Sequence, residues 1–376
     1  MRFLSVLLTI VFFSTSSMAA NVVKIGALVS ITGPTAFLGV PEENTLKMLV
    51  SDINKAGGVN GKKIKLIVYD TKGKPSSGVI LARKLIYTDR VSAIVGPTRS
   101  GTTLAIIPLI QRARIPLISM ASSYKITTPV KKWVFKTAPS DSLAVERLYS
   151  YMRDNKMSNV ALLSASTGFG DSGREELKKL SSKYGINIVA DEVFGPKDTN
   201  MIPQLVKIKN TKGVQAIICW GTNPGPASVA KNAKELGIKL PIFMSHGVAS
   251  KKFIQLARDA AENIMLPAGK LMVANQLPNN DPQKKVLLKY KKEYESKFGS
   301  VSTFGGHAYD AINIIKLALQ NGATNKKSLR KEIEQTKNFV GITGIFNYSK
   351  NDHAGLDPSD FSIIKIVNGD WKLLSY

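Results

Sequence analysis

The sequence predicts an α/β protein built from two doubly wound parallel sheets, and three observations lead to this fold class. The chain has 376 residues, of which 44% are hydrophobic and 21% charged, enough to build two domains with separate cores. Apolar segments with strand and helix periodicity alternate along it, as in sheets whose strands run parallel. The alternation begins again after Ala138-Pro139-Ser140-Asp141, which indicates two modules.

The first module is read from the spacing of its apolar residues. Buried or alternating runs predict strands, and apolar residues three or four positions apart predict helices. We expect strands over 22–29, 63–69, 92–95 and 115–119, and helices over 45–54, 77–86 and 103–112.

The second module follows the same pattern and opens with a helix that Ser140 or Asp141 can cap. We expect helices over 143–154, 174–184, 201–208 and 227–236, and strands over 160–164, 187–193, 215–219 and 241–244. The later helices, 283–298 and 307–320, do not extend the second sheet. Residues 361–367 and 371–374 predict a closing hairpin around Asn368-Gly369.

The first twenty residues have the pattern of an export signal. Arg2 precedes an apolar run over 3–13, and a small polar segment ends at Ala19-Ala20. We therefore expect residues 1–20 to be a cleaved signal peptide and the mature protein to be periplasmic or extracellular. No cysteine lies near the cleavage site, so a lipid anchor is not expected. No later window reaches the roughly 18 apolar residues of a membrane span, so the mature protein is expected to be soluble.

The composition argues against nucleic-acid binding and metal chemistry. Lys and Arg number 52 against 27 Asp and Glu, a formal net charge of +25. Only 11 of these are Arg, and the Lys residues are spread along amphipathic segments. This distribution is typical of a solvated surface, which could still steer anionic ligands. One cysteine and three histidines offer little material for a metal site, and we expect no cofactor.

A glycine-rich segment invites a dinucleotide-binding interpretation. Residues 168–173 match G-x-G-x-x-G and Asp191 follows about 20 residues later. However, residues 165–167 separate the strand from the first glycine, whereas the fingerprint needs a tight turn directly at the strand end. An exported protein would also meet little NAD. We favour a glycine-rich loop at the edge of a cleft, and no hydrolase, P-loop or zinc-protease motif occurs.

Two loops contain candidate binding groups. Residues 96–103 join a strand to a helix, so Ser100 is a plausible N-cap and the amides of residues 101–103 lie at the positive end of the helix dipole. Such a helix start favours a carboxylate ligand. Residues 119–123 leave the next strand at its carboxyl end, where open α/β sheets bind ligands. The alternative is that these small hydroxyl residues only cap helices.

Taken together, these residues resemble the periplasmic solute-binding proteins of branched-chain amino acid ABC transporters, also called the leucine-binding or extracellular ligand-binding receptor family. The likeness covers nearly the whole mature chain. Its motifs are Ile25-Gly26, Thr32-Gly33-Pro34, Asp52-Ile53-Asn54, 57–62, Asp70, Ile94-Val95-Gly96, 115–119, Gly168-Phe169-Gly170, Pro267-Ala268-Gly269 and Tyr309-Asp310-Ala311.

The resemblance implies a type I periplasmic binding protein fold, in which three hinge crossovers join two lobes. By analogy, residues 21–139 plus 272–345 form lobe one, and residues 140–271 plus 346–376 form lobe two. Returning the chain to lobe one would explain why the late helices do not extend the second sheet.

The resemblance also assigns residues to a pocket between the lobes. Ser100 falls where the family binds the ligand carboxylate, and Ala121 and Ser123 match backbone and hydroxyl contacts of the next loop. Phe169 lies where an aromatic ring closes over the ligand. The expected ligand-binding set is Leu38, Ser100, Gly101, Thr102, Ala121, Ser122, Ser123, Phe169, Trp220, Thr222, His246 and Phe304.

Two positions depart from the family pattern. Amino acid binders hold the ammonium with a carboxylate after the strand that ends here at Met244, but this chain has His246, which cannot supply that charge. Thr222 lies where leucine binders tend to have a tyrosine. Trp220 could contribute an apolar surface to the pocket. We hypothesise that the ligand lacks an α-ammonium, unless His246 lies outside the pocket.

The other two histidines, His307 and His353, and the single cysteine, Cys219, are interpreted as structural residues.

The predicted function is that of a non-enzymatic, monomeric, periplasmic substrate-binding protein of an ABC importer. It would capture a small carboxylate, either a branched-chain or related amino acid or an aromatic or aliphatic acid, and deliver it to the membrane permease. A ligand-sensing receptor that acts on a signalling partner is one alternative. An exported enzyme is another, but no nucleophile and base have a suitable spacing.

Overall fold

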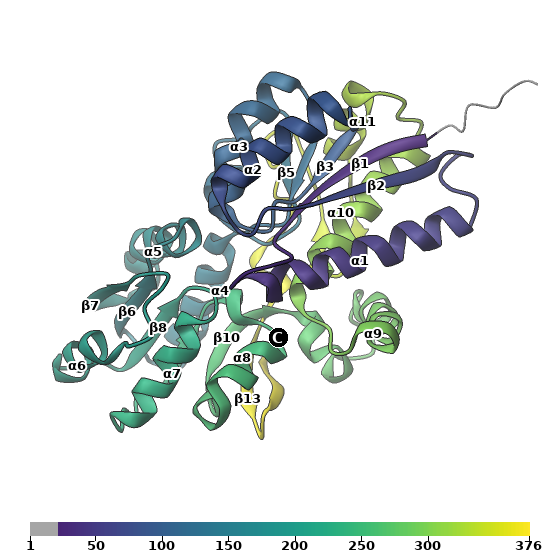
Figure 1. The fold of residues 1–376 in the computed structure, drawn as a ribbon. Helices are drawn as coiled ribbons and strands as arrows, with labels where there is room; N and C mark the ends of the chain where they lie inside the picture. The colour runs from purple at the N-terminus through teal and green to yellow at the C-terminus, as the bar shows by residue number, and fades with distance from the viewer. Residues whose placement is uncertain (1–21) are drawn as a thin grey trace, which may run out of the picture.

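The computed structural model describes residues 22–376, so the expected signal peptide lies outside the described residues. The chain forms two α/β halves, each built around its own sheet (Figure 1). The strand order is β2-β1-β3-β4-β5 in the first sheet and β14-β13-β10-β9-β8-β6-β7 in the second. Strands β11 (Phe339–Val340) and β12 (Ile345–Phe346) form a separate small ladder.

The first half consists of a parallel sheet with helices on both faces. Its elements are β1 (Val22–Val29), β2 (Lys63–Asp70), β3 (Ala93–Val95), β4 (Leu117–Ser119), β5 (Val134–Lys136), α1 (Ala36–Lys55), α2 (Pro75–Arg83), α3 (Ser100–Ala113), α10 (Thr303–Gln320) and α11 (Lys326–Glu334). Within β1, Ile25, Ala27 and Val29 pack toward α1 and α10, whereas Leu28 packs toward α2 and α3. Both faces of this strand are therefore buried, as in a doubly wound sheet.

The second half combines a parallel sheet with an antiparallel hairpin. Its elements are α4 (Asp141–Asp154), β6 (Asn159–Ala165), α5 (Gly168–Ser181), β7 (Asn187–Phe194), α6 (Ile202–Asn210), β8 (Ala216–Trp220), α7 (Gly225–Glu235), β9 (Ile242–Met244), α8 (Lys251–Ala257), β10 (Met265–Gly269), β13 (Phe361–Val367) and β14 (Asp370–Ser375). β13 runs antiparallel to β10 and pairs with β14. Asn368 and Gly369 turn this hairpin with φ of 52° and 70°, as their sequence predicts.

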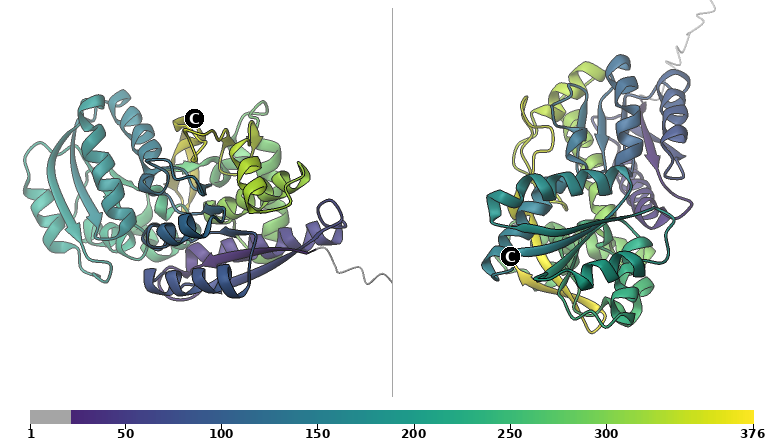
Figure 2. Two further views of the ribbon diagram at one scale, coloured as in Figure 1. Left: turned by 90° about the horizontal axis from the view of Figure 1, so that it is seen from above. Right: turned by 90° about the vertical axis from the view of Figure 1, so that its left-hand side faces the viewer.

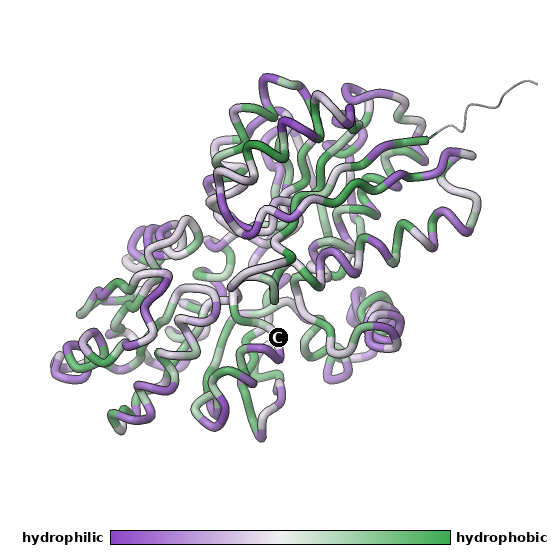
Figure 3. Tube along the Cα trace, in the orientation of Figure 1, coloured by the Kyte–Doolittle hydropathy of each residue, from purple (hydrophilic) through white to green (hydrophobic). Residues whose placement is uncertain are grey.

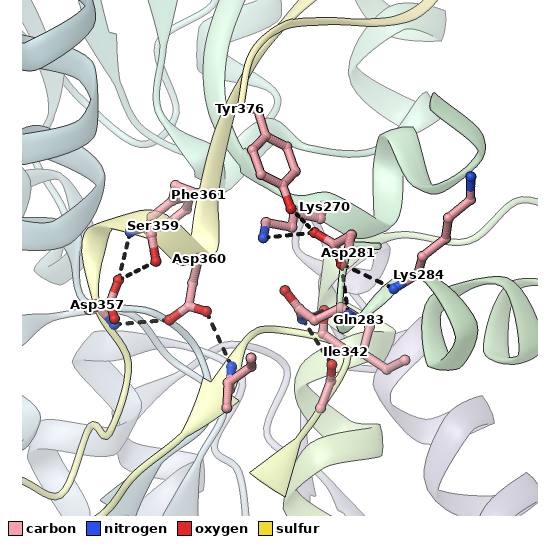
Figure 4. A network of polar contacts seen from close by, with 12 residues as sticks. Lys270, Asp281, Gln283, Lys284, Ile342, Asp357, Ser359, Asp360, Phe361 and Tyr376 are labelled. Atoms are coloured by element: carbon pink, nitrogen blue, oxygen red, sulfur yellow. Dashed lines mark hydrogen bonds and ion pairs between the residues drawn. The ribbon is translucent and has the colours of Figure 1, made fainter. Parts of the chain in front are cut away.

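The chain passes between the halves three times, after β5, after β10 and after β12. A polar network lies beside the second and third passages (Figure 4). The Lys270 ammonium lies 3.1 Å from the Asp281 carboxylate, which also accepts the Tyr376 hydroxyl. Nearby, Asp360 accepts the Ile345 N–H at 3.2 Å. These bonds satisfy charged groups that burial would otherwise make costly.

Helix α9 (Lys284–Phe298) does not extend the second sheet, as the sequence predicts. It packs against the 3₁₀ segment Lys270–Gln276 and reaches α1, where the hydroxyls of Tyr290 and Thr45 are 2.7 Å apart. Figure 2 shows the two halves of the chain from two further sides. The lobe boundaries inferred from the resemblance remain a prediction.

Differences from the expected elements have local causes. α1 begins nine residues before the expected start. Its first turns contain Gly39 and Pro41, which interrupt the helical spacing of apolar residues and hide this part of the helix in the sequence. α5 begins at Gly168 instead of 174, since its first turn is glycine-rich and is capped by the Thr167 hydroxyl, which accepts the Gly170 N–H at 3.1 Å. The sequence reading also missed β5, β10, α8 and α11.

Hydropathy follows the layers of the fold (Figure 3). The strands are mostly apolar, and hydrophilic residues are concentrated on the helices and loops. Among residues 22–376, none of the helices combines the length and apolar content that a membrane crossing requires.

Candidate functional site

A cavity of about 260 Å³ lies between the two halves, at the carboxyl ends of strands from both sheets. This is the edge where α/β sheets bind ligands. Ten of the twelve expected residues line the cavity, and Ser123 and Trp220 do not. The wall is formed by Leu38, Gly73, Pro75, Thr98, Arg99, Ser100, Gly101, Thr102, Met120, Ala121, Ser122, Thr167, Gly168, Phe169, Pro196, Thr222, His246, Gly247, Phe304 and His307.

Two helix N-termini face each other across this cavity. α3 begins at Ser100 and α5 at Gly168, and a Cβ on Gly168 would lie 3.0 Å from the Gly101 Cα. A side chain at Gly168 would therefore crowd the first turn of α3. The positive ends of both helix dipoles are therefore directed at the same space, which favours an anion.

The expected N-cap role of Ser100 is wrong. Arg99 occupies the N-cap position with extended backbone angles, and Ser100 is the first helical residue. The Ser100 hydroxyl instead accepts the Ser123 N–H at 3.2 Å, which ties the loop after β3 to the loop after β4.

The loop after β4 contributes Ala121 and Ser122 to the wall. Ser123 is turned away from the cavity, because its hydroxyl lies 2.7 Å from that of Ser172 in the second half. The hydroxyl contact that the resemblance assigns to Ser123 is thus replaced by a contact between the two halves.

His246 lies on the cavity wall from the second half and is only 6% exposed. Neither of its ring nitrogens has a hydrogen-bond partner within residues 22–376. The ring is held by Phe169, Trp220 and Phe361, with centroids 5.2, 5.7 and 5.4 Å away. Burial lowers the pKa of His246 to about 3, so the imidazole is neutral and offers one donor and one acceptor. Trp220 does not line the cavity but packs against Phe169 and His246, which do.

His307, which the sequence reading treated as structural, also reaches the wall. Its Nδ1 lies 3.0 Å from the Thr343 hydroxyl, and burial lowers its pKa to about 3. His353, by contrast, has a structural role, since it stacks on Phe135 at 4.0 Å and its Nδ1 lies 2.8 Å from the Val134 carbonyl oxygen.

Arg99 is a wall residue that the sequence reading missed. Its Nη1 donates to the Gly73 carbonyl at 3.3 Å, and within the described part of the chain the guanidinium has no carboxylate partner. Burial lowers the pKa of Arg99, yet an arginine remains protonated in proteins. Its position directly before Ser100, at the start of a helix that follows a strand, is the signal in the sequence that could have identified it.

The glycines of residues 168–173 serve close packing. A Cβ on Gly170 would lie 1.8 Å from the Ala165 carbonyl oxygen, and one on Gly173 would lie 1.9 Å from Trp220 Nε1. Asp191 is bound by the Arg174 guanidinium at 2.7 and 2.6 Å. The preference for a cleft-edge loop over a dinucleotide fingerprint agrees with these contacts.

The arrangement is shared with known proteins. Residues 22–369 match the family described as periplasmic binding protein. The chain belongs to this family. A curated relative from Pseudomonas aeruginosa, a leucine-, isoleucine-, valine-, threonine- and alanine-binding protein, is 25% identical over 93% of this chain and 91% of its own length.

Solved structures of the family share the same fold. An extracellular ligand-binding receptor from Rhodopseudomonas palustris HaA2 has a TM-score of 0.88 and 27% identity, covering 94% of this chain and 100% of the other. The branched-chain amino acid transporter substrate binding protein LivJ from Streptococcus pneumoniae, in complex with isoleucine, has a TM-score of 0.81 and 25% identity, covering 94% and 99%. The predicted type I periplasmic binding protein fold is confirmed by these matches.

Proposed function

We propose that this protein is the substrate-binding component of an ABC importer and captures a small carboxylate in the cavity between its halves. One observation carries the proposal. The cavity joins the N-termini of α3 and α5, from opposite halves, with the amides and hydroxyls of Ser100, Gly101 and Thr102 on one side. A carboxylate is the ligand group that such helix starts favour.

The proposed cycle follows from this two-sided cavity. The first half binds the carboxylate, and movement about the three crossovers then brings Phe169, Thr222 and His246 over the rest of the ligand. Closure excludes water and strengthens each polar contact. The closed form is what the permease recognises, and the ligand leaves chemically unchanged because the protein is a carrier and not an enzyme.

The proposal includes the compartment and the assembly state. Residues 1–20 are removed as a signal peptide, and the mature protein works in the periplasm as a monomer. Its relatives' printed names, which include leucine, isoleucine and valine among their ligands, support branched-chain amino acids as one candidate class. The other candidate class is aromatic or aliphatic acids.

A thermal-shift screen of ligand-stripped mature protein tests the proposal. The panel contains the common amino acids together with aromatic and short aliphatic acids. A ligand at 100 times its Kd should add about 2.7 kcal/mol to the free energy of unfolding. A panel in which no carboxylate raises the melting temperature, while calorimetry also finds no binding, would refute capture of a small carboxylate.

A further inference from the structure

The charges on the cavity wall point to a specific class of ligand. We infer that the cavity selects an organic acid without an ammonium group, and that Arg99 supplies the cation that binds its carboxylate. The inference rests on the proposed function, because it names the ligand class and a binding residue of the same cavity.

The wall offers no negative charge. Among the described residues that form it, Arg99 is the only charged side chain, and the two histidines are neutral. An ammonium group would face this guanidinium and two positive helix ends without a counter-charge. Burying a charge without a partner is costly, so amino acids should bind weakly.

One carboxyl lies close behind the wall. Glu42 accepts a hydrogen bond from the hydroxyl of the wall residue Thr98 and is fully buried on α1. Burial raises the pKa of Glu42 well above its usual value, and it is not part of the wall. Glu42 therefore does not face a ligand in the cavity, and its burial disfavours the charged form.

The Arg99 guanidinium is placed to receive an anion. Of its five N–H donors, one bonds to the Gly73 carbonyl, and the others have no protein partner within residues 22–376. Gly73 makes room for the side chain, since a Cβ there would lie 3.1 Å from the Arg99 Cδ. Arg99 directly precedes Ser100, so its charge adds to the partial positive charge of the α3 amides. The planar guanidinium can also bind both oxygens of a carboxylate at once.

The second-half side of the cavity selects the other end of the ligand. The His246 ring lies among aromatic side chains, and neither of its nitrogens has a hydrogen-bond partner in the described chain. A hydroxyl or carbonyl group of the ligand could form the missing hydrogen bond. Leu38, Met120 and Phe304 supply apolar wall. The favoured ligand is thus an apolar or aromatic monocarboxylic acid that carries a neutral polar group away from its carboxylate.

Ligand pairs that differ only in the ammonium group test this inference. Titration calorimetry of the mature protein would compare leucine with 4-methylpentanoate, phenylalanine with 3-phenylpropanoate, and tyrosine with 3-(4-hydroxyphenyl)propanoate. We expect the ammonium-free member of a pair to bind at least ~100-fold more tightly, and the hydroxylated acid to bind most tightly.

Arg99→Gln should then weaken binding of the best acid by about 30- to 100-fold. Arg99→Lys should weaken it by less, because lysine keeps the positive charge but cannot make two parallel hydrogen bonds to a carboxylate. Arg112→Gln, at an exposed position on α3, is the matched control and should bind as the wild type does. His246→Phe should remove the preference for the hydroxylated acid.

The outcomes separate the inference from the proposed function. Tighter binding of the amino acid in each pair would overturn the ligand class and leave the carrier function standing. An Arg99→Gln variant with unchanged affinity and unchanged melting temperature would overturn the role of Arg99. If Arg99→Gln does not fold, a wild-type affinity in Arg99→Met, which keeps an unbranched side chain without the charge, would have the same meaning. Absence of binding by every acid and amino acid would refute the proposed function itself.

Discussion

The two sides of the cavity satisfy their polar groups in different ways. On the first-half side, the Ser100 hydroxyl accepts the Ser123 N–H, and the Ser119 hydroxyl accepts the Ala121 N–H at 3.2 Å. On the second-half side, His246 has no hydrogen-bond partner in the described chain and contacts aromatic rings instead. The loops of the first side are tied to each other, although Arg99 and the Thr102 hydroxyl keep hydrogen-bonding groups for a ligand. On the second side the unpaired group is a neutral histidine among aromatic rings.

This contrast suggests a division of tasks. A preformed group of amides and hydroxyls can bind any carboxylic acid, because it contacts only the carboxylate that all such acids share. In the proposed function the second side would face the variable part of the ligand, so we expect its unpaired histidine to decide which acid is accepted.

The largest effect is expected from His246→Glu. The new carboxylate would face the ligand from the second side and supply the counter-charge that an ammonium needs. Affinity for 4-methylpentanoate should fall about 100-fold, or about 2.7 kcal/mol, and affinity for leucine should rise. Calorimetry with both ligands measures this exchange.

His246→Gln is the control for this variant, since it keeps neutral donors and acceptors and should lose less affinity for the acid. A leucine Kd that is the same in wild type and His246→Glu would contradict the assignment of His246 to the pocket.

The second prediction concerns pH. The pKa values of His246 and His307 are lowered to about 3 by burial, so the unfolded chain takes up protons near pH 6.5 that the folded chain cannot. Stability should therefore fall as the pH falls from 6.5 toward 3, by about 1.4 kcal/mol per pH unit for each histidine. Ligand affinity should stay constant between about pH 5 and 8, because both rings remain neutral.

Urea unfolding of wild type and His246→Gln at several pH values isolates this contribution. Asp141, whose pKa burial raises to about 6, acts in the opposite direction, since its protonated form is favoured in the folded state. The difference between the two proteins, about 2 kcal/mol accumulated between pH 6.5 and 5, is the quantity to compare. Parallel pH curves would mean that His246 is not buried and neutral.

Ser100→Ala tests the preformed side and should have a smaller effect. It removes the acceptor of a buried Ser123 N–H, which costs on the order of 1–3 kcal/mol in stability. The affinity should fall about 10-fold for every acid in the panel, because the first-half side of the cavity contacts only the carboxylate. Ser76→Ala, at an exposed position on α2, is the control. A loss restricted to one acid would break the proposed division of tasks.

The sequence predicts much of this site because the succession of strands and helices along the chain and the ends of the strands are local properties. Parallel strands put the loops that contain Ser100 and Ala121 at the carboxyl edge of the first sheet and the loop that contains Phe169 at the carboxyl edge of the second, without any knowledge of side-chain packing. Arg99 and Ser123 were misjudged because the direction of a side chain depends on its neighbours, such as Gly73 and Ser172.

His307 was missed for a related reason. It lies on α10, which begins after the second passage between the halves. Which face of that helix meets the cavity depends on how the halves are oriented, and helical periodicity alone does not specify this orientation. Residues held by one sheet were thus easier to predict than residues placed by both.

The smallest effect is expected where the halves touch outside the cavity. Glu175 on α5 contacts the Lys125 ammonium at 2.7 Å and the Tyr124 hydroxyl at 3.2 Å, and both partners belong to the first half. These groups are exposed, so the ion pair should contribute only about 0.2–1 kcal/mol to closure.

Glu175→Gln should therefore weaken binding about two- to five-fold at low ionic strength and have less effect at high ionic strength, because salt screens the exposed pair. Glu192→Gln is the matched control. It breaks the 3.0 Å pair with Lys207 that lies entirely within the second half, so it should leave the Kd unchanged. Equal effects of the two substitutions would mean that surface charge, and not closure of the halves, sets the change in affinity. An effect of Glu175→Gln alone, equal for every acid, would show that closure adds affinity without adding selectivity, which leaves selection to His246.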